Sequence, residues 1–302
     1  MLEILKIEKY IVGIDLGGTR IKGVLINEKG AIIEQIYEPT NDRTGDWKVA
    51  IKLAVEVLKA KSPAPISAVG MSAPGLPNAE NTAIAYYPDR LQGLENFEWE
   101  SYLGEKTCVL NDAHAAVMAE LGFGVAKGKK NVVLLTLGTG VGGGIVINGE
   151  LYQGLHQKAG HIGHTTVDSS DFSPSILNMP GSIEEAIGNY SVEKRSLGKF
   201  KSTHELVQAY QQNDTWGTYV WLTSVQKLAV ILASLTNILS PEIIVLGGGI
   251  SDADDALFRP LSIFMDFYEF RGNNPATPIV KAQFGNMAGA MGAASFAMRR
   301  FL

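Results

Sequence analysis

The sequence predicts an α/β protein of two lobes, each built around a hairpin unit that occurs twice in the chain. Segments of strand-like composition alternate with segments of helical periodicity, which is the order expected of an α/β fold. A length of 302 residues is long for a single domain and favours two lobes. Two glycine-rich stretches that lie 121 positions apart match each other in sequence. Together these observations predict duplicated βββαβα units with a cleft between the lobes.

The later glycine-rich stretch covers residues 131–150 and reads NVVLLTLGTGVGGGIVINGE. Runs of Val, Leu and Ile around a glycine cluster predict a β-hairpin, and five of the seven residues 138–144 are glycine. A tight turn needs fewer glycines than this. Glycine collects where backbone N–H groups come close to a ligand, and a phosphate is the usual ligand of such a concave set of N–H groups.

The earlier stretch, residues 10–30, carries the same pattern. Its matching residues are identical to their partners or are aliphatic swaps, at Ile14, Leu16, Gly17, Gly23, Val24, Leu25, Ile26 and Asn27. Asp15 aligns with Thr136, so a carboxylate stands at the base of one hairpin and a hydroxyl at the base of the other. The match favours a duplicated unit whose two hairpin tips together hold a polyphosphate and its metal. The alternative is two unrelated glycine-rich hairpins.

The first elements follow from periodicity and turn signals. After the hairpin Tyr10–Ile26 we expect strands at Ala31–Glu38, Ile66–Met71 and Thr107–Leu110, and helices from Asp46 to about Lys61, at Phe97–Leu103 and at Ala113–Gly122. The helix capped by Asp46 has Trp47, Ile51, Ala54, Val55 and Leu58 at helical spacing. Residues 81–96 show no periodicity and are predicted to form a long excursion, a candidate substrate loop.

The later elements begin after a loop-rich segment, residues 153–182. Ser182 is expected to cap a helix at Ile183–Tyr190, with Glu184 and Glu185 in its first turn, where the helix dipole favours acids. Further helices are predicted at Thr203–Gln211, Thr218–Leu239, Asp254–Phe267 (restarting at Pro260) and Ala288–Arg299, and strands at Glu242–Leu246 and Ile279–Phe284.

Composition excludes several classes of protein. The net charge of −5 and the absence of a Lys/Arg cluster argue against a nucleic-acid partner. Cys108 is the single cysteine, which excludes an intramolecular disulfide and a thiolate metal cage. The first ten residues lack a signal sequence, and the apolar run at 228–239 is too short to cross a bilayer. We therefore expect a cytoplasmic protein with no membrane partner.

Asp112 is the candidate catalytic residue. It follows a predicted strand and precedes a predicted helix, and ligands of α/β sheets bind at the carboxyl ends of strands. There it can accept a proton from an attacking hydroxyl while Asn111 orients the substrate, or it can simply cap the helix. The local sequence does not separate these alternatives. The phosphate-binding hairpins favour the catalytic one, since phosphoryl transfer needs a base or orienting acid on the acceptor side.

Other polar and glycine residues complete the candidate site. Asp15 is predicted to lie near the phosphates, directly or through water on Mg²⁺, the alternative being a turn aspartate. Gly247, Gly248 and Gly249 follow an apolar strand and permit close approach of a nucleotide, although this signal is weak alone. The pair His161 and His164 favours a polar ligand over a metal, and His156 is expected to have no ligand role.

On these residues, the chain resembles the ROK family of sugar kinases and related repressors, within the hexokinase/actin-like ATPase superfamily. The matching stretches are residues 14–25 (IDLGGTRIKGVL), 72–75 (SAPG), 111–120 (NDAHAAVMAE), 136–151 (TLGTGVGGGIVINGEL), 159–164 (AGHIGH), 244–249 (IVLGGG) and 289–294 (GAMGAA). The resemblance implies a two-lobed actin-like (ribonuclease H-like) fold. It places the first lobe at residues 1–112, completed by about 288–302, and the second at 113–287.

The resemblance also implies an activity and a set of ligands. The expected reaction is transfer of the ATP γ-phosphate to a hydroxyl of a hexose or N-acetylhexosamine with Mg²⁺, by a glucokinase-like homodimer. The implied roles are Asp112 as base, Asp15 on the metal side, Gly75, Asn111, His161, His164 and Glu184 at the sugar, Gly17, Gly18, Thr19, Gly138, Thr139 and Gly140 at the phosphates, and Gly247, Gly248 and Gly249 at adenosine.

The sequence departs from the family pattern at two places. Many relatives follow the histidine with a C-x-C-G-x-x-G-C-x-E zinc motif, whereas Ser182 stands here at the position of its last cysteine, so zinc is not expected. Packing of Phe172, Ile176 and Leu177 is expected to hold the loop instead. His161 replaces a glutamate that accepts two sugar hydrogen bonds, which would weaken or redirect sugar recognition by about 1.5–3 kcal/mol.

A regulatory protein is the alternative function. Repressor members carry a helix-turn-helix before the first hairpin, and only nine residues precede Tyr10, so a DNA-binding domain is not expected. A catalytically silent sugar or nucleotide sensor remains, and His161 makes it conceivable. Retention of Asp15 and Asp112 favours the enzyme.

Overall fold

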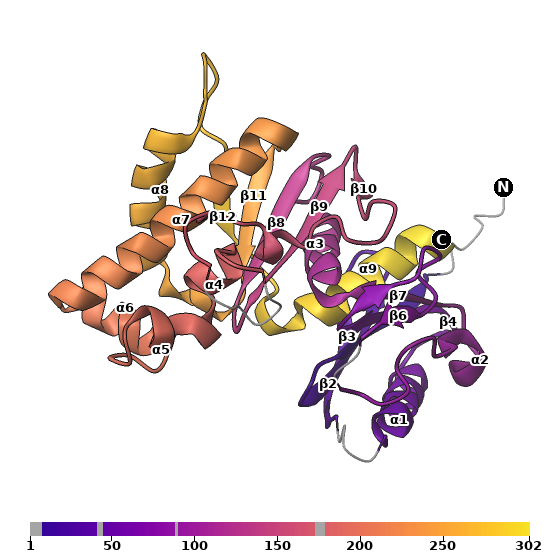
Figure 1. Ribbon diagram of the computed structural model, residues 1–302. Helices are drawn as coiled ribbons and strands as arrows, with labels where there is room; N and C mark the ends of the chain where they lie inside the picture. The colour runs from indigo at the N-terminus through magenta and orange to yellow at the C-terminus, as the bar shows by residue number, and fades with distance from the viewer. Residues whose placement is uncertain (1–7, 41–44, 88–89, 173–178) are drawn as a thin grey trace. The chain divides into compact units, whose positions relative to one another are not determined.

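The computed structural model describes residues 8–40, 45–87, 90–172 and 179–302 (Figure 1). Its contacts divide the chain into two compact units. The first comprises Met1–Gly128, Gln153–Ala159 and Asn286–Leu302, and the second comprises Lys129–Tyr152 and Gly160–Gly285. Helix α9 (Ala288–Phe301) belongs to the first unit. Helix α3 (Asp112–Phe123) packs on α9 and also belongs to it, whereas the sequence-based boundary after Asp112 put α3 in the second lobe.

The first unit is built on a five-stranded sheet in the order β3-β2-β1-β4-β7. Its strands are β1 (Tyr10–Leu16), β2 (Arg20–Asn27), β3 (Ile32–Pro39), β4 (Ile66–Ala73) and β7 (Thr107–Asn111). The first three form an antiparallel meander, and β4 and β7 extend the sheet in parallel with β1. Each strand overlaps a predicted one.

Helices cover the two faces of this sheet. On one face, α1 (Trp47–Ala60) buries Trp47, Ile51, Ala54, Val55 and Leu58, the same residues that the helical spacing predicted. On the other face, α9 lies against the strand backbones: a Cβ atom at Gly13 or at Gly70 would stand 2.0 Å from a carbonyl oxygen of α9. Glycine at these positions therefore allows the helix to approach the sheet.

The described residues between 81 and 96 form a largely irregular segment that packs part of its apolar side chains into the core. Strand β5 (Leu76–Pro77) pairs with β6 (Ile84–Tyr86), and α2 (Trp99–Leu103) follows. Ile84, Leu91 and Leu94 are buried in the same core as β1 and α1. Apart from β6, the described residues of this segment lack regular secondary structure, as the missing periodicity predicted, and its role as a substrate loop stays a prediction.

The second unit repeats the first sheet, in the order β10-β9-β8-β11-β12. Its strands are β8 (Val132–Leu137), β9 (Val141–Ile147), β10 (Glu150–Leu151), β11 (Ile243–Gly247) and β12 (Ile279–Lys281). The predicted duplication is confirmed in the strand order, with one difference in register. Leu16 pairs with Ile21, but Leu137 pairs with Val141, so the tips are residues 17–20 and 138–140 and the second is one residue shorter.

The helices of the second unit form a core with its sheet. They are α4 (Ile183–Ile187), α5 (Val192–Arg195), α6 (Thr203–Gln211), α7 (Thr215–Leu239) and α8 (Asp255–Tyr268), with 3₁₀ turns η1 (Ile162–His164), η2 (Asn189–Ser191) and η3 (Gly249–Ala253). The turn η4 (Gly285–Met287) begins with the last residue of this unit and continues into the first. In Figure 1, α7 is the long orange helix beside β11.

Helix α7 is longer than the apolar run at 228–239 suggested. The helix was predicted at Thr218–Leu239, and with 25 residues it is long and apolar enough to cross a membrane by length and composition alone. The same test is passed by core helices, and here Trp221, Leu228 and Leu232 are fully buried against α4, α6 and α8.

Helix α8 continues through Pro260, where a restart was predicted. Proline lacks the N–H group that would bond the carbonyl four residues earlier, that of Ala256. The indole N–H of Trp221 donates to this oxygen at 2.8 Å instead. A side chain of α7 thus satisfies the carbonyl that the proline leaves open, and the helix persists.

Candidate functional site

The candidate catalytic residues lie at one edge of the first sheet. Strands β1, β4 and β7 are parallel neighbours, so their carboxyl ends meet at this edge. Asp15 pairs in register with Ser72, and Ala73 pairs with Asn111, the residue before Asp112. This edge is where α/β sheets bind ligands. The structure therefore brings Asp15, at the end of β1, to the same edge as Asn111 and Asp112, which stand at the end of β7 and the start of α3.

Asp15 is nearly buried and makes two side-chain contacts. Its Oδ1 accepts a hydrogen bond from Ser72 Oγ at 2.8 Å, and its Oδ2 pairs with Lys22 Nζ at 3.2 Å. A Cβ atom at Gly289 would lie 2.4 Å from Oδ1, so glycine at the start of α9 leaves space for the carboxylate. These contacts hold Asp15 in one orientation, and it is not a simple turn aspartate.

Asn111, not Asp112, is the N-cap of α3. Its Oδ1 accepts from the Ala113 amide at 3.0 Å, and its Nδ2 donates to the Gly75 carbonyl at 3.0 Å. Gly75 has φ +99°, and a Cβ there would meet the Tyr86 carbonyl at 2.5 Å. Asn111 and Gly75, both predicted at the sugar, are thus in contact. The capping role that the sequence left open for Asp112 falls to its neighbour.

Asp112 is the first residue of α3, and water reaches its side chain. The surrounding protein desolvates the carboxyl, and the nearby charge of Asp15 adds to this effect. Hydrogen bonds from the Ala113 amide and from Asn111 act in the opposite direction. The net result raises the pKa of Asp112 to about 6. Although the side chain is exposed, desolvation is the largest cause, because many protein atoms stand near it.

The tip of the first hairpin is held by hydrogen bonds to its carbonyl groups. Thr40 donates through its hydroxyl to Gly17 O at 2.6 Å and through its amide to Thr19 O at 3.1 Å. Arg90 donates to Gly18 O at 2.8 Å. Sequence reasoning missed Thr40 and Arg90, since neither belongs to a motif. With its carbonyls engaged, the tip can direct amide groups toward a ligand.

The tip of the second hairpin is attached to the segment from α4 to η2. Val141 N donates to Glu184 Oε2 at 2.9 Å, Asn189 N to Gly138 O at 2.9 Å and Tyr190 N to Thr139 O at 3.1 Å. A Cβ at Gly140 would lie 2.2 Å from Glu184 Oε2. Glu184, predicted only at the sugar, therefore also fixes the predicted phosphate tip.

A cavity of about 720 Å³ opens beside this second tip. Gly138, Thr139 and Gly249 all line it, so predicted phosphate and adenosine residues share one cavity. Gly248 has φ +83°, and a Cβ there would meet the Leu137 carbonyl at 2.4 Å, which explains a glycine at this turn. The volume lies within the usual range of small-molecule sites.

His161 precedes the turn η1 and His164 is its last residue, with the buried Ile162 and Gly163 between them. The two histidine rings are stacked, with centroids 6.0 Å apart and planes inclined by 8°. His156, for which no ligand role was predicted, is exposed. Among the described residues, no group of three or more His, Cys, Asp or Glu is placed to share a metal ion.

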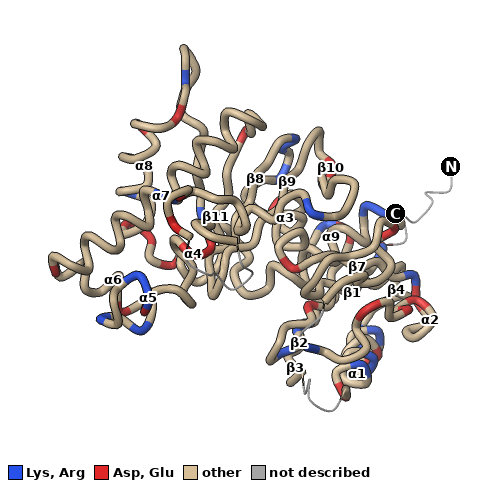
Figure 2. Tube along the Cα trace, in the orientation of Figure 1, with Lys and Arg blue, Asp and Glu red and all other residues tan. Residues whose placement is uncertain are grey.

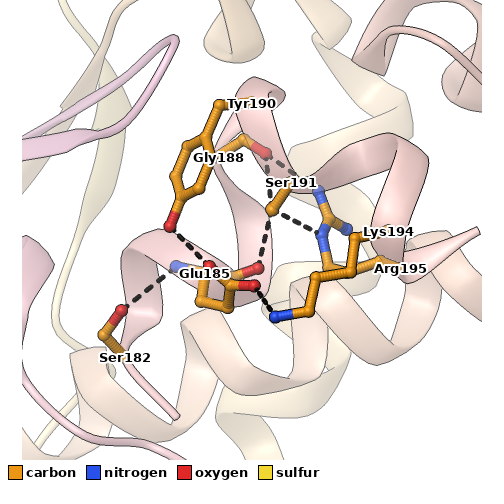
Figure 3. Close-up of polar contacts among 7 residues, drawn as sticks. All are labelled: Ser182, Glu185, Gly188, Tyr190, Ser191, Lys194 and Arg195. Carbon is orange, nitrogen blue, oxygen red and sulfur yellow. Dashed lines mark hydrogen bonds and ion pairs between the residues drawn. The ribbon is translucent and has the colours of Figure 1, made fainter. Parts of the chain in front are cut away.

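Figure 3 shows polar contacts that connect α4 with the residues that follow it, up to Arg195. Ser182 caps the helix as predicted, with its hydroxyl accepting from the Glu185 amide at 3.2 Å. Buried Glu185 accepts from Tyr190 Oη at 2.6 Å and pairs with Lys194. Arg195 donates to Ser191 Oγ at 3.0 Å and to Gly188 O at 3.1 Å.

Packing of Phe172 does not hold this segment. Its side chain is 84% exposed, which overturns that expectation, while Ile176 and Leu177 lie outside the described residues. Polar contacts take this role instead. Val167 N donates to Gly181 O at 2.8 Å, and Lys227 on α7 pairs with Asp168 at 2.8 Å. Ion pairing with Lys227 lowers the pKa of Asp168.

Lys and Arg are interleaved with Asp and Glu along the described chain (Figure 2). The basic turns near α5 are paired with acids: Lys194 with Glu185, Lys199 with Asp214, and Lys201 with Glu193. A continuous basic face suited to a nucleic acid is therefore not formed by these residues.

Comparison with known proteins finds relatives that match most of the chain. The ROK family model matches residues 11–300. A glucokinase from Halalkalibacterium halodurans is 30% identical, over 94% of this chain and 94% of its own. An N-acetylmannosamine kinase from Escherichia coli is 27% identical, over 84% of this chain and 89% of its own. The crystal structure of a ROK hexokinase from Thermus thermophilus superimposes with a TM-score of 0.86 at 26% identity, covering 96% of this chain and 98% of that one.

Proposed function

Since the chain belongs to the ROK family and is a sugar kinase, we propose that it transfers the γ-phosphate of ATP to a hydroxyl of a hexose or N-acetylhexosamine. The two-lobed actin-like ATPase fold is that of its structural relatives. A cytoplasmic location and a homodimer are part of the proposal on family grounds.

The observation that carries the proposed mechanism is the carboxyl of Asp112 beside that of Asp15 at the edge of the first sheet. A pKa of about 6 leaves Asp112 largely ionised at pH 7 and makes it a stronger base than an ordinary aspartate. As the sugar oxygen forms its bond to the γ-phosphorus, Asp112 accepts the hydroxyl proton and the bond to the ADP oxygen breaks. Asn111, held by Gly75 and the Ala113 amide, orients the acceptor.

We assign the donor to the cavity beside the second tip. Amides of Thr139 and Gly140 are not used in the contacts that fix the tip, and they are suited to phosphate oxygens. Gly249, which also lines the cavity, would face the adenosine part. Glu184, together with His161 and His164, would bind the sugar from the same unit.

The residues present also fit a Mg²⁺ ion. The charge of Asp15 raises the pKa of Asp112, and a cation at this strand edge would stabilise the ionised carboxylate of Asp112. Asp15 would hold the ion directly or through water. When bound, the ion would neutralise charge on the phosphates.

The proposal is tested by ADP release with glucose, mannose, fructose, allose, N-acetylglucosamine and N-acetylmannosamine. We expect turnover with at least one of them. His161 in place of the family glutamate makes the choice of sugar the least constrained part of the proposal. Nucleotide binding without ADP release in any reaction would instead favour a regulatory sensor.

The role of Asp112 is tested on the sugar that is turned over. Asp112→Asn should lower kcat by about 10²–10⁴-fold and leave sugar affinity near normal, because the amide cannot take the proton. Asp266→Asn, an exposed site on α8, is the control and should leave kcat unchanged. Equal turnover in Asp112→Asn and the parent would remove Asp112 from this role.

A further inference from the structure

We propose that the cavity beside the second tip selects a nucleoside triphosphate and rejects inorganic polyphosphate as the phosphoryl donor. This inference rests on the proposed function, and it concerns the chemistry of the donor beyond the phosphates held at the tip. Beyond the phosphates bound at the tip, the remaining part of a nucleotide is a neutral nucleoside. A polyphosphate continues as a chain with about one negative charge per phosphate, so the charge of the cavity separates the two donors.

The side chains around the cavity are acidic. Asp252, Asp254 and Asp255 line it. No Lys or Arg is found among the described residues that line the cavity. The nearest partner for these acids is Lys281, which pairs with Asp252 at 3.0 Å and with Asp254 at 2.8 Å. Lys281 is therefore already engaged, and three carboxylates face one ammonium group.

Two helix N-termini at the cavity act in the opposite direction. Ser202 and Thr203 begin α6, and Asp255 begins α8. Each terminus carries the equivalent of roughly half a positive charge, and this falls off within one turn. The Ser202 hydroxyl accepts from the Glu205 amide, and the acids Glu205 and Asp255 stand in the first turns. The full charges of three aspartates exceed these partial charges, so the cavity is net negative.

The same groups suit a nucleoside. Ribose hydroxyls and the exocyclic amine of adenine are donors, and the carboxylates are acceptors. His204 and Gln208 add polar groups from α6, with Val207 between them as an apolar surface for a base. The cavity volume of about 720 Å³ is ample for a nucleoside. What the cavity offers beyond the tip is therefore recognition of a neutral group rich in donors.

The test compares kcat/KM for Mg-ATP and for Mg-tripolyphosphate in the full chain, with the sugar found to be turned over. We expect ATP to be preferred by at least about a hundredfold, and we expect salt to narrow the difference, because these acids are exposed at the cavity rim. Comparable kcat/KM for the two donors would overturn the inference while leaving the kinase function intact.

Charge-removing variants make the test specific. The double variant Asp252→Asn, Asp255→Asn should raise the tripolyphosphate-to-ATP ratio of kcat/KM by roughly three- to tenfold, because two like charges are removed. Structural damage would lower both rates and leave the ratio unchanged. Asp266→Asn, on α8 but not among the cavity residues, is the matched control. An unchanged ratio in the double variant would overturn the inference.

Calorimetric titration separates this inference from the proposed function. ADP and tripolyphosphate are titrated into the parent and the double variant with Mg²⁺ and no sugar. We expect the parent to bind ADP more tightly than tripolyphosphate. The ratio of the two dissociation constants should be closer to one in the double variant. If neither donor supported turnover, the kinase proposal would fail, and this binding ratio would still decide the selectivity of the cavity.

Discussion

At the scale of single residues, the environment of Asp112 differs from what its sequence context alone suggests. A carboxylate in the first turn of a helix normally has a lowered pKa, because backbone N–H groups and the helix dipole favour its charge. Here desolvation and the charge of Asp15 outweigh those effects. The Asn111-Asp112 pair predicted a helix N-cap and a candidate catalytic base. It did not show which residue has which role, because that depends on where β7 ends and α3 begins.

The raised pKa predicts the pH dependence of catalysis. Asp112 must be ionised to accept a proton, so kcat/KM should fall about tenfold per pH unit below a pKa near 6. An aspartate in water would hold its activity to about pH 4. The measurement is a pH–rate profile with saturating Mg²⁺, with circular dichroism at each pH to show that the chain remains folded.

A histidine near the sugar would also make the pH–rate profile fall on its acidic side, in the same pH range as Asp112. His161→Asn removes one such group without touching Asp112, and we expect this acidic limb of the profile to keep its position in this variant. A limb that moves or disappears in His161→Asn would assign it to the imidazole. A parent profile flat down to pH 5 would contradict the raised pKa.

At the scale of elements, the segment from α4 to α5 links the candidate sugar residue to the phosphate tip. Glu184 and the amides of Asn189 and Tyr190 hold the tip, while Glu185 on the same helix is fixed in the interior by Tyr190 and Lys194. Burial lowers the pKa of Arg195 to about 10, and the charge of Glu185 partly offsets this. The cluster in Figure 3 therefore depends on that carboxylate.

Glu185→Gln should destabilise this segment and weaken the binding of both the sugar and ATP. Removing the charge leaves the buried guanidinium of Arg195 less compensated, at a cost of about 2–4 kcal/mol in the free energy of unfolding. Because α4 carries Glu184 and holds the tip, KM for sugar and for ATP should rise together. Thermal unfolding and steady-state kinetics measure the two effects.

The control for this prediction is Glu193→Gln, which removes a solvent-exposed pair with Lys201 in the same stretch. It should cost less than about 0.5 kcal/mol and leave both KM values unchanged. Tyr190→Phe is a milder variant that removes one hydrogen bond to Glu185. Parent-like KM values in Tyr190→Phe and Glu185→Gln would show that the cluster does not position the tip.

The elements themselves were largely predictable, for physical reasons that particular cases show. The 3.6-residue spacing of apolar residues predicts the buried face of helix α1. Glycines between aliphatic runs predict the β1–β2 hairpin. Helix α8 was harder, because the carbonyl freed by Pro260 is satisfied by Trp221 from a distant part of the chain. Short elements such as β6 and α5 depend on tertiary contacts and carry no periodic signal of their own.

At the scale of the whole molecule, the duplication was visible in the sequence because both copies keep the same glycines and aliphatic residues. The strand order of the two sheets agrees with it. The register difference between the tips was not visible, since a gapless match cannot show which residues pair across a turn. Arg90 and Thr40 support the first tip and the α4–η2 segment supports the second, and the sequence match between the two hairpins includes none of these residues.

The chain passes between the two compact units four times, at 128/129, 152/153, 159/160 and 285/286. Gly128, Gly160 and Gly285 stand at three of these crossings with φ of +81°, +91° and +48°. Positive φ at each is a conformation that other residues rarely adopt. The family resemblance implies that the lobes close on the sugar, and we propose that these glycines act as hinges in that motion.

Gly128→Ala tests the hinge against a matched control. Gly128 and Gly198 have φ of +81° and +82°, and a Cβ at either meets nothing within 4 Å, but Gly198 lies within the second unit. Alanine should therefore cost each variant a similar amount, about 1 kcal/mol of folding free energy. If Gly128 absorbs backbone rotation during turnover, only Gly128→Ala should change kcat and KM together, by several-fold or more. Equal thermal destabilisation with equal, parent-like kinetics in both variants would show that residue 128 is a strained turn and not a hinge.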